Sequence, residues 1–395
     1  MAIRRHKRHF QKGKPVNMIV SAIQTEEEFC SLENEWNCLL RNSASDTVFL
    51  TWEWMRTWWK YYGTGKSLFI ITVRGEAGRL LGLAPLCIKN TGFHGLATLK
   101  ALSFLGSGEV CADYLDFIAE AGKEREVLKA IFDSLNAGSR LWDYVLLSDI
   151  PEKSETLDII LNGVGSSHFI AGVNECPFID LPDNYGSYLE GLGSNTRYNL
   201  SRRTRAIYRK FDAEFSACDG DGVENQMESL FELHRKRREM IGKEGSFLSE
   251  KLSAFHREVS RTFSKIGVLK IYRLLIGGKP AAMLYGFKYG GKFFYYQSGM
   301  DPQYEKESVG TALMGHCIRD SIESGLKEFD FLRGNEAYKH RWTGTSRKTV
   351  DIVLRPERLK GRALMSAESL IVRAKRLVKM SVAPRGSKGS GKKAL

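Results

Sequence analysis

The chain has 395 residues, of which 43 % are hydrophobic and 11 % aromatic, and its formal net charge is +13. This length exceeds that of a usual single core, so we expect two domains, and the apolar content is sufficient for both. The seven cysteines show neither CxxC nor metal-ligand spacing, which favours reduced thiols in the core of a cytoplasmic protein. No apolar segment approaches 18 residues, and no apolar signal core follows the N-terminus, so neither a membrane span nor secretion is predicted.

The positive charge lies at the two ends of the chain. Residues 1–17 contain six basic side chains and no acid, and the segment from Ser369 onward contains eight more, again without an acid. Subtracting these fourteen charges from +13 leaves about −1 for everything between, so no specific nucleic-acid contact is predicted for the body. We expect residues 1–17 to form a disordered basic tail.

The N-terminal part begins with MIVSAIQ, which indicates a strand, and continues with an amphipathic segment. Thr25 and Glu28 have the spacing of a capping box at the start of that helix. The stretch WEWMRTWWKYY then predicts a helix with aromatic residues on more than one face. Trp54 and Trp58 are interpreted either as parts of a core or inter-domain helix or as the wall of an acceptor pocket, where tryptophan stacks on sugar or aryl groups.

A hairpin, a loop, a helix and a strand follow. SLFIITVR and RLLGLAPLCIK form the hairpin, residues 122–137 the helix and LWDYVLLSDI the strand. The glycine-rich loop between them carries Asp113 and Asp116, whose carboxylates either cap the loop or act in catalysis. The order of helices and strands expected from residue 18 to about residue 150 weakly resembles the order expected near the C-terminus, which is described below. An internal duplication is therefore predicted.

A dense basic helix is predicted in the middle of the chain, with the side chains Arg197, Arg202, Arg203, Arg205, Arg209 and Lys210. Helical spacing places Arg203 and Ile207 on a different face from Arg202 and Arg205. The basic set is either a solvated face or a clamp for an anionic group, because guanidinium groups bind phosphates in a bidentate way. Arg197, Arg202 and Arg205 are the candidates for substrate binding.

The segment from Ile266 to Val353 is the most informative. Three β-rich runs, VLKIYRLLI, PAAMLYGFKY and KFFYYQSGM, are separated by glycine pairs, which predicts an antiparallel meander. A run with helical spacing then begins near Ser308 and ends at Gly325. Its small first turn, up to Ala312, has free backbone amides that either are simply capped or hold a phosphate or pyrophosphate.

The order of meander, loop, S-V-G-T-A helix and D-F-x-x-G-x-x-x-Y-K-x-x-W resembles the GNAT-type acyltransferase family. It is more closely similar to the branch of cellulose-biosynthesis-type acetyltransferases, relatives of the Fem-type aminoacyltransferases. Segments 49–63 and 194–210 also resemble that branch, so the patches lie across most of residues 45–345. Glu307 departs from the family pattern, which has Gln or Arg three residues before its first glycine.

The resemblance implies an α/β (α+β) fold with two tandem GNAT-like lobes, each a mixed, mostly antiparallel sheet flanked by helices. The predicted domain order is a basic tail (1–17), an N-terminal lobe (18–180), a helical connection (181–265), a C-terminal lobe with the acyl-donor site (266–357), and a basic amphipathic helix with a flexible tail (358–395). The helix at 364–380 suits either an anionic membrane surface at the inner face or packing against the protein itself.

Acyl transfer from a thioester needs a held pyrophosphate, a strand edge for the pantetheine amide, an oxyanion donor and a proton acceptor. The resemblance implies acetyl-CoA or another acyl-CoA as co-substrate, with no metal. The predicted donor-binding residues are Gln297, Ser298, Gly299, Ser308, Val309, Gly310, Thr311 and Ala312. The predicted catalytic residues are Asp330, Glu336, Tyr338 and Lys339, of which Tyr338 and Lys339 resemble an aromatic–lysine pair of the Fem-type relatives.

Their expected roles differ. Lys339 would stabilise charge or clamp the substrate, and Tyr338 would act as an acid or orient the substrate. Glu336 is a plausible base only if it is partly buried, because an ordinary glutamate is too weak a base at neutral pH. Asp330 is either a base or a structural partner of Arg333.

The predicted function is acyl transfer from acyl-CoA to an amine or hydroxyl of a sugar or cell-envelope precursor. The acceptor is expected between the lobes. One alternative is an aminoacyl-tRNA-dependent Fem-type ligase, and another is a non-catalytic ligand-binding partner in polysaccharide assembly.

Overall fold

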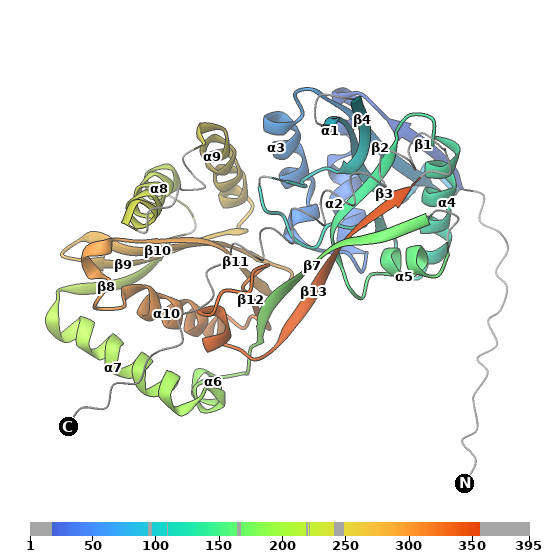
Figure 1. The fold of residues 1–395 in the computed structure, drawn as a ribbon. Coiled ribbons are helices and arrows are strands. Elements are labelled where there is room, and N and C mark those ends of the chain that lie inside the picture. Colours follow the sequence, from blue (N-terminus) through green and yellow to red (C-terminus); the bar gives the residue numbers. More distant parts are fainter. Residues whose placement is uncertain are drawn as a thin grey trace, which may run out of the picture.

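The structure, a computed structural model, describes residues 18–93, 97–108, 110–163, 167–218, 220, 222–240 and 249–355. The predicted tail at 1–17 and the predicted helix at 364–380 lie outside these ranges. Within them, every helix is too short or too polar to cross a bilayer. The fold is α/β, with two lobes that share one mixed, mostly antiparallel sheet (Figure 1).

The N-terminal lobe starts with a four-stranded antiparallel arrangement, and its fourth strand then pairs in parallel with β6. Its strands are β1 (Ile19–Ile23), β2 (Lys66–Arg74), β3 (Leu80–Phe93), β4 (Ala97–Phe104), β5 (Ile118–Ala119), β6 (Tyr144–Pro151) and β7 (Ser167–Asp180). Its helices are α1 (Glu26–Ser31), α2 (Glu33–Arg41), α3 (Trp52–Tyr62), α4 (Glu124–Ala137) and α5 (Glu155–Leu161).

The C-terminal lobe repeats this order: β8 to β11 are antiparallel neighbours, and β11 pairs in parallel with β12. Its strands are β8 (Ala213–Cys218), β9 (Leu269–Ile276), β10 (Lys279–Tyr289), β11 (Lys292–Met300), β12 (Glu328–Asp330) and β13 (Ser346–Arg355). Its helices are α6 (Tyr185–Gly191), α7 (Ser194–Lys210), α8 (Val223–Met240), α9 (Glu250–Lys265) and α10 (Val309–Glu323). In both lobes the same pairing pattern recurs, which supports the predicted duplication. Residues 181–265, predicted as a helical connection, contain β8, which extends the C-terminal sheet.

Two long strands join the lobes. In the centre of the sheet the order is β6-β13-β7-β12, so β13 pairs with a strand of the N-terminal lobe and β7 with a strand of the C-terminal lobe. Figure 1 shows both strands passing from one lobe to the other. Each lobe therefore completes the sheet of the other, and the two cannot separate without breaking strand pairs.

The predicted meander of β9, β10 and β11 is confirmed. Its two turns are Gly277-Gly278 and Gly290-Gly291, and all four residues have positive φ angles between 55° and 74°. Two consecutive positive φ values are required by the tight hairpin turns that match the twist of adjacent strands, and glycine adopts them without steric cost. The N-cap half of the predicted capping box is present, because the Glu28 amide donates to Thr25 Oγ1 at 3.3 Å. The Glu28 carboxylate accepts from the Gln24 amide at 3.4 Å, one residue before the position that a capping box uses.

The seam between the lobes is aromatic. The Trp54 ring of α3 makes edge contacts with Phe255 of α9 and with Phe287 of β10, at centroid distances of 5.2 and 5.7 Å. Phe49 contacts Phe287 and Phe294 in the same way. Each such pair contributes about 0.5–1.5 kcal/mol beyond the burial of its apolar area, so this seam holds the lobes in a fixed arrangement.

One histidine in this seam gives a prediction for pH dependence. His256 is 1 % exposed, and burial lowers its pKa to about 3. The unfolded chain therefore binds a proton below about pH 6.5 that the folded chain excludes, so stability is full above that pH and falls as the pH drops. Between neutral pH and pH 5, the free energy of unfolding of His256→Gln should fall by about 2 kcal/mol less than that of the unmodified protein. Urea unfolding at the two pH values measures this difference.

The matched control is His340→Gln, which makes the same change at an exposed position. It should keep the pH slope of the unmodified protein, because the other titrating groups contribute equally to both. Equal slopes for His256→Gln and the unmodified protein would contradict the neutral, buried state of His256.

The cysteines follow the expectation only in part. All seven, each at a described position, are outside disulfide bonds, and Cys87, Cys176 and Cys317 are buried as predicted. Cys30, Cys38 and Cys111 are exposed, so the prediction that the set lies in the core was too broad. The exposed thiols lie in surface helices and a loop, where their flanking apolar residues face inward.

Candidate acyl-donor site

The site begins where the parallel pair of β11 and β12 ends. These strands pair only from Lys292 to Phe294 on β11 and from Glu328 to Asp330 on β12. Beyond Phe294, β11 continues to Met300 and pairs with β10 alone among the described strands. One edge of β11 therefore keeps backbone groups that are free to bind an extended ligand.

A β-bulge lies at the start of this open edge. Tyr285 pairs with Gln297 and the next residue, Gly286, pairs with Tyr295, so Tyr296 has no partner on β10. Bulges redirect side chains and interrupt the ladder, often beside active sites. Here the bulge turns the hydroxyl of Ser298 toward Tyr295, and the two oxygens lie 2.7 Å apart.

The N-terminus of α10 faces this edge. Ser308 precedes the helix in the left-handed conformation (φ 60°, ψ 40°), and its side chain makes no capping bond. Its Oγ instead accepts a hydrogen bond from Arg203 Nη1 at 2.7 Å. The first bond of the helix is donated by the Thr311 amide to the Ser308 carbonyl, so the amides of Val309 and Gly310 precede the ladder. Such a helix start attracts anions.

A cavity of about 600 Å³ joins these features. Ser308, Gly310 and Thr311 line it at the helix start, and Ser298 and Met300 line it along β11. Its charged lining consists of Arg203, Arg237, Arg341 and Glu305. Three cations against one anion make the cavity suited to a ligand that carries phosphate groups.

A short chain of hydroxyl groups forms the other end of this cavity. Tyr338 donates a hydrogen bond to the Tyr295 hydroxyl at 3.4 Å, and Tyr295 is in turn bonded to Ser298. Burial raises the pKa of Tyr338 above its usual value, and the neighbouring Tyr295 raises it further. Tyr338 therefore stays protonated at neutral pH, and its hydroxyl can donate a hydrogen bond to a bound group.

Lys339 does not take the predicted role. Its side chain is buried, and its Nζ donates to the Leu332 and Arg333 carbonyls at 3.2 and 2.8 Å. It also pairs with Glu336 at 3.0 Å. The ammonium group is thus used to hold the loop after β12, and the prediction of a charge stabiliser at the reaction centre is corrected to a structural one.

Glu336 also fails the condition set for it. Its side chain is 55 % exposed, whereas a catalytic base at this position requires partial burial. The carboxylate lies against Gly334, where an added Cβ would meet its oxygen at 2.3 Å. Its contacts are those of a loop residue.

Asp330 is fully buried at the end of β12. Its two oxygens accept hydrogen bonds from the Tyr114 hydroxyl at 2.8 Å and from the Leu332 amide at 2.7 Å. Burial raises the pKa of Asp330 to about 6. It forms no ion pair with Arg333, the structural partner proposed for it, and it remains a candidate for the proton acceptor.

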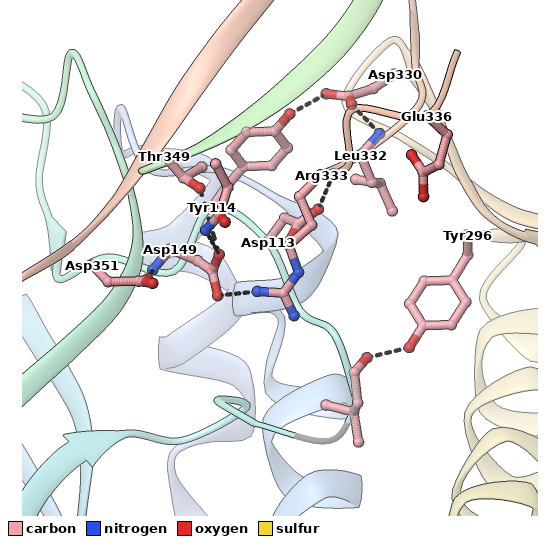
Figure 2. A network of polar contacts seen from close by, with 12 residues as sticks. Asp113, Tyr114, Asp149, Tyr296, Asp330, Leu332, Arg333, Glu336, Thr349 and Asp351 are labelled. Carbon is pink, nitrogen blue, oxygen red and sulfur yellow. Dashed lines mark hydrogen bonds and ion pairs between the residues drawn. The ribbon is translucent and has the colours of Figure 1, made fainter. Parts of the chain in front are cut away.

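Arg333 belongs to a separate network that ties the lobes together (Figure 2). Its Nη1 lies 2.5 Å from Asp149 Oδ2, and its Nε lies 3.2 Å from Asp113 Oδ1. Burial raises the pKa of Asp113 to about 7 despite the arginine. Asp113 therefore serves in an inter-lobe ion pair, which neither interpretation from the sequence had anticipated.

Backbone strain gathers around the same network. Cys111, Tyr114, Asp149 and Leu332 all have φ between 49° and 59°, a region that residues with a Cβ rarely adopt. Strain of this kind persists only where the surroundings enforce it, and it concentrates at functional sites. Tyr114 and Leu332 are the two residues that donate hydrogen bonds to Asp330, so the strain fixes the position of that carboxylate.

The predicted donor residues divide into two groups. Ser298, Ser308, Gly310 and Thr311 line the cavity. The other four are Gln297, Gly299, Val309 and Ala312. Of these, the last two are buried in the core, and Gly299 is tightly covered by α8, since an added Cβ would meet the His234 amide at 2.7 Å. Gln297 accepts a hydrogen bond from the amide of the next residue at 3.1 Å.

The predicted substrate-binding residues lie outside this cavity. Trp54 and Trp58 are at most 1 % exposed, so they are core residues and not a pocket wall. Arg197 donates to carbonyls at the end of α6, and Arg202 is exposed. Arg205 lines a smaller groove between α6, α7 and α10.

The sequence interpretation missed Arg203, Arg237 and Arg341. Arg203 had been grouped with Ile207 on the other face of its helix, and this inward face packs on α10: an added Cβ at Gly315 would meet Leu200 at 2.7 Å. An arginine at the edge of an apolar helix face was the available signal. Glu307 carries a negative charge close to the start of α10, where it would repel an anion. Lys210 pairs with it at 2.8 Å and offsets this charge.

Comparison with known proteins agrees with this geometry. Residues 194–340 match the family model described as an acetyltransferase (GNAT) domain. This segment, which is less than half of the chain, is therefore similar to a GNAT acetyltransferase domain. No curated protein sequence matches the chain.

Three solved structures share the fold. FemX is similar over 81 % of this chain and 95 % of its own, with 13 % identity and a TM-score of 0.57. L-PGS from Bacillus licheniformis is similar over 89 % and 96 %, with 12 % identity and a TM-score of 0.51. The C-terminal domain of a putative lysylphosphatidylglycerol synthetase from Agrobacterium fabrum is similar over 87 % and 97 %, with 11 % identity and a TM-score of 0.51. At these identities the similarity shows the fold alone.

Proposed function

We propose that the chain moves an acyl group, acetyl in the simplest case, from acyl-CoA directly to an amine or hydroxyl of a sugar or cell-envelope precursor. One observation carries this proposal: a single cavity brings together the α10 N-terminus, the open edge of β11 and the hydroxyl of Tyr338. The acetyltransferase-domain match supports acyl transfer. The resemblance to the cellulose-biosynthesis-type branch supports the class of acceptor.

The residues of the cavity fit a donor that contains a pyrophosphate. An added Cβ at Gly310 would meet only Met300 Sδ, at 3.7 Å, so packing does not require glycine there. Its missing side chain instead leaves room beside the free amides at the helix start. Arg203, Arg237 and Arg341 supply the positive charge.

The chain's own groups have distinct roles in this proposal. The donor supplies a thioester, whose carbonyl is open to attack by a nucleophile. Backbone groups on the open edge of β11 orient the pantetheine arm, Asp330 accepts the proton of the attacking group, and the Tyr338 hydroxyl donates a hydrogen bond to the departing sulfur. The transfer is direct, because no nucleophilic side chain with an adjacent base lines the described cavity.

Titration calorimetry with the full chain tests this proposal. Acetyl-CoA and CoA are expected to bind with similar affinity, because both carry the pyrophosphate that the cavity is suited to hold. Charged tRNA should neither bind nor displace acetyl-CoA. Failure of both CoA compounds to bind would overturn the proposed donor.

A second candidate is supported by the outer face of α7. Arg202, Arg205 and Arg209 are exposed there, next to the cavity, and a basic helix of this kind suits an RNA backbone. Tight binding of charged tRNA without binding of acetyl-CoA would favour an aminoacyl-tRNA-dependent ligase. Binding of none of the three ligands would favour a non-catalytic partner in polysaccharide assembly.

A further inference from the structure

A second cavity, of about 260 Å³, lies between the lobes. The N-terminal lobe contributes Asp46, Thr47 and Asp116 to its wall, and the C-terminal lobe contributes Phe294 and Asp330. This volume has room for several water molecules and hence for a small ligand, but not for a polymer. None of its lining residues lines the donor cavity.

Consecutive residues of β11 line the two cavities at the end of the β11–β12 pair. Phe294 lines the inter-lobe cavity and the next residue, Tyr295, lines the donor cavity. Consecutive strand residues point to opposite faces of a sheet, so the cavities lie on opposite faces of β11. Phe294 and Asp330 form the last paired position, and beyond it the sheet is interrupted. A group held in the inter-lobe cavity therefore lies beside the position at which the pairing of β11 with β12 ends.

The wall of the inter-lobe cavity contains a buried hydroxyl group, that of Thr47. Thr47 is 5 % exposed, lines the cavity, and its Oγ1 has no hydrogen-bond partner. Thr47 occupies the N-cap position of the short helical turn Val48–Leu50 but makes no capping bond with its side chain. A buried hydroxyl without a partner costs stability, so a ligand that pairs with it would remove this cost.

The charges of the wall favour a cation. The acidic lining residues are Asp46, Asp116, Glu124, Glu155 and Asp330, and the basic ones are Lys153, Lys292 and Arg347. Lys292 and Arg347 share one carboxylate, Glu328, at 3.2 and 2.5 Å, which offsets one of the three basic charges. Arg125 pairs with Glu155 at 2.6 Å and offsets one of the five acidic charges. The wall thus keeps an excess of negative charge for an incoming ligand.

Further polar groups in the wall suit hydroxyls. The Ser154 hydroxyl donates to Asp116 Oδ2 at 2.5 Å, and the Ser45 hydroxyl donates to the Phe117 carbonyl at 2.9 Å. Each of these hydroxyl oxygens keeps lone pairs that can accept from a ligand. Phe117 and Phe294 supply apolar surface in the same wall, on which the C–H face of a ring can lie.

We propose that the inter-lobe cavity is the acceptor site, and that the acceptor is a small primary amine that carries several hydroxyl groups, of the amino-sugar class. This inference rests on the proposed acyltransferase function. The bound ammonium first gives one proton to Asp330, which leaves a neutral amine. The amine nitrogen then forms a bond to the acyl carbon, the carbon–sulfur bond of the thioester breaks, and the second proton passes from the nitrogen to the sulfur, which leaves as a thiol while the Tyr338 hydroxyl donates a hydrogen bond to it.

Calorimetry with glucosamine and glucose, each in the presence of CoA, tests this inference on the full chain. Glucosamine is expected to bind at least about tenfold more tightly than glucose, because only the amine is cationic. Thr47→Val should weaken glucosamine binding about fivefold through the loss of one hydrogen bond, and its melting temperature should be equal or higher. The control Thr64→Val makes the same change at an exposed turn and should bind as the unmodified protein does.

Equal binding of the two sugars, absence of glucosamine binding, or an unchanged affinity in Thr47→Val would overturn the inference. Binding of acetyl-CoA, measured separately, distinguishes this failure from failure of the proposed function. If acetyl-CoA binds and glucosamine does not, acyl transfer stands and the acceptor assignment falls. If glucosamine binds and acetyl-CoA does not, the cavity remains a ligand site but its role as acceptor site is overturned.

Discussion

Gly310→Val is expected to weaken acetyl-CoA binding by more than about 100-fold while the fold stays intact. The valine side chain would project into the cavity beside the free amides of the α10 N-terminus, where the proposal places the pyrophosphate. The fold should tolerate the change, because an added Cβ meets only Met300 Sδ at 3.7 Å. Valine also has a somewhat better helix propensity than glycine.

Calorimetry gives the affinity, and thermal unfolding shows whether the fold is retained. Gly191→Val is the matched control, since Gly191 is an exposed residue at the end of α6 and an added Cβ there meets nothing within 4 Å. It should bind acetyl-CoA as the unmodified protein does. An unchanged affinity in Gly310→Val would remove the pyrophosphate from this position.

Local features of the fold were predictable from the sequence. The glycine pairs of the meander, the N-cap at Thr25 and the start of α10 depend on residues close together in the chain, and all three are confirmed. The exchange of β7 and β13 between the lobes was not predicted. Strand order is set by contacts between distant residues, and each strand's own pattern says only that it lies in a sheet.

The site was predictable in outline and not in its side chains. The helix start at Ser308 and the tyrosine at 338 line one cavity, and both lie on segments that follow the meander. Lys339 was misassigned because burial of a lysine depends on carbonyl groups that fold back over it, at Leu332 and Arg333. A charged run such as KHR gives no indication of which member points inward.

Asp330→Asn is expected to lower turnover by about 100-fold or more at neutral pH, while acetyl-CoA affinity changes little. Asparagine keeps the size of the side chain but cannot accept a proton from the attacking group. The donor cavity does not include Asp330, so the loss should appear in kcat and not in donor binding. The fold should be retained, because a neutral side chain is less costly than a carboxylate in a fully buried position.

The pH profile separates a base from a structural carboxylate. Burial raises the pKa of Asp330 to about 6, and a base must be deprotonated to act, so turnover should rise with pH through about 6 and then level. Asp330→Asn should lack this limb. Tyr114→Phe removes the hydrogen bond that the Tyr114 hydroxyl donates to the carboxylate at 2.8 Å. Since that bond favours the charged form, its loss should move the limb to higher pH, with a smaller loss of turnover.

These results would connect the strained backbone to the chemistry. Tyr114 belongs to the N-terminal lobe and Leu332 to the loop after β12, and both hold one carboxylate from left-handed backbone positions. If Asp330 served only to join the lobes, Asp330→Asn would change the free energy of unfolding and would leave the pH dependence of turnover as it is in the unmodified protein. Turnover within threefold of the unmodified protein in Asp330→Asn, or an unshifted limb in Tyr114→Phe, would therefore assign Asp330 to the lobe interface and leave the proton acceptor to another group.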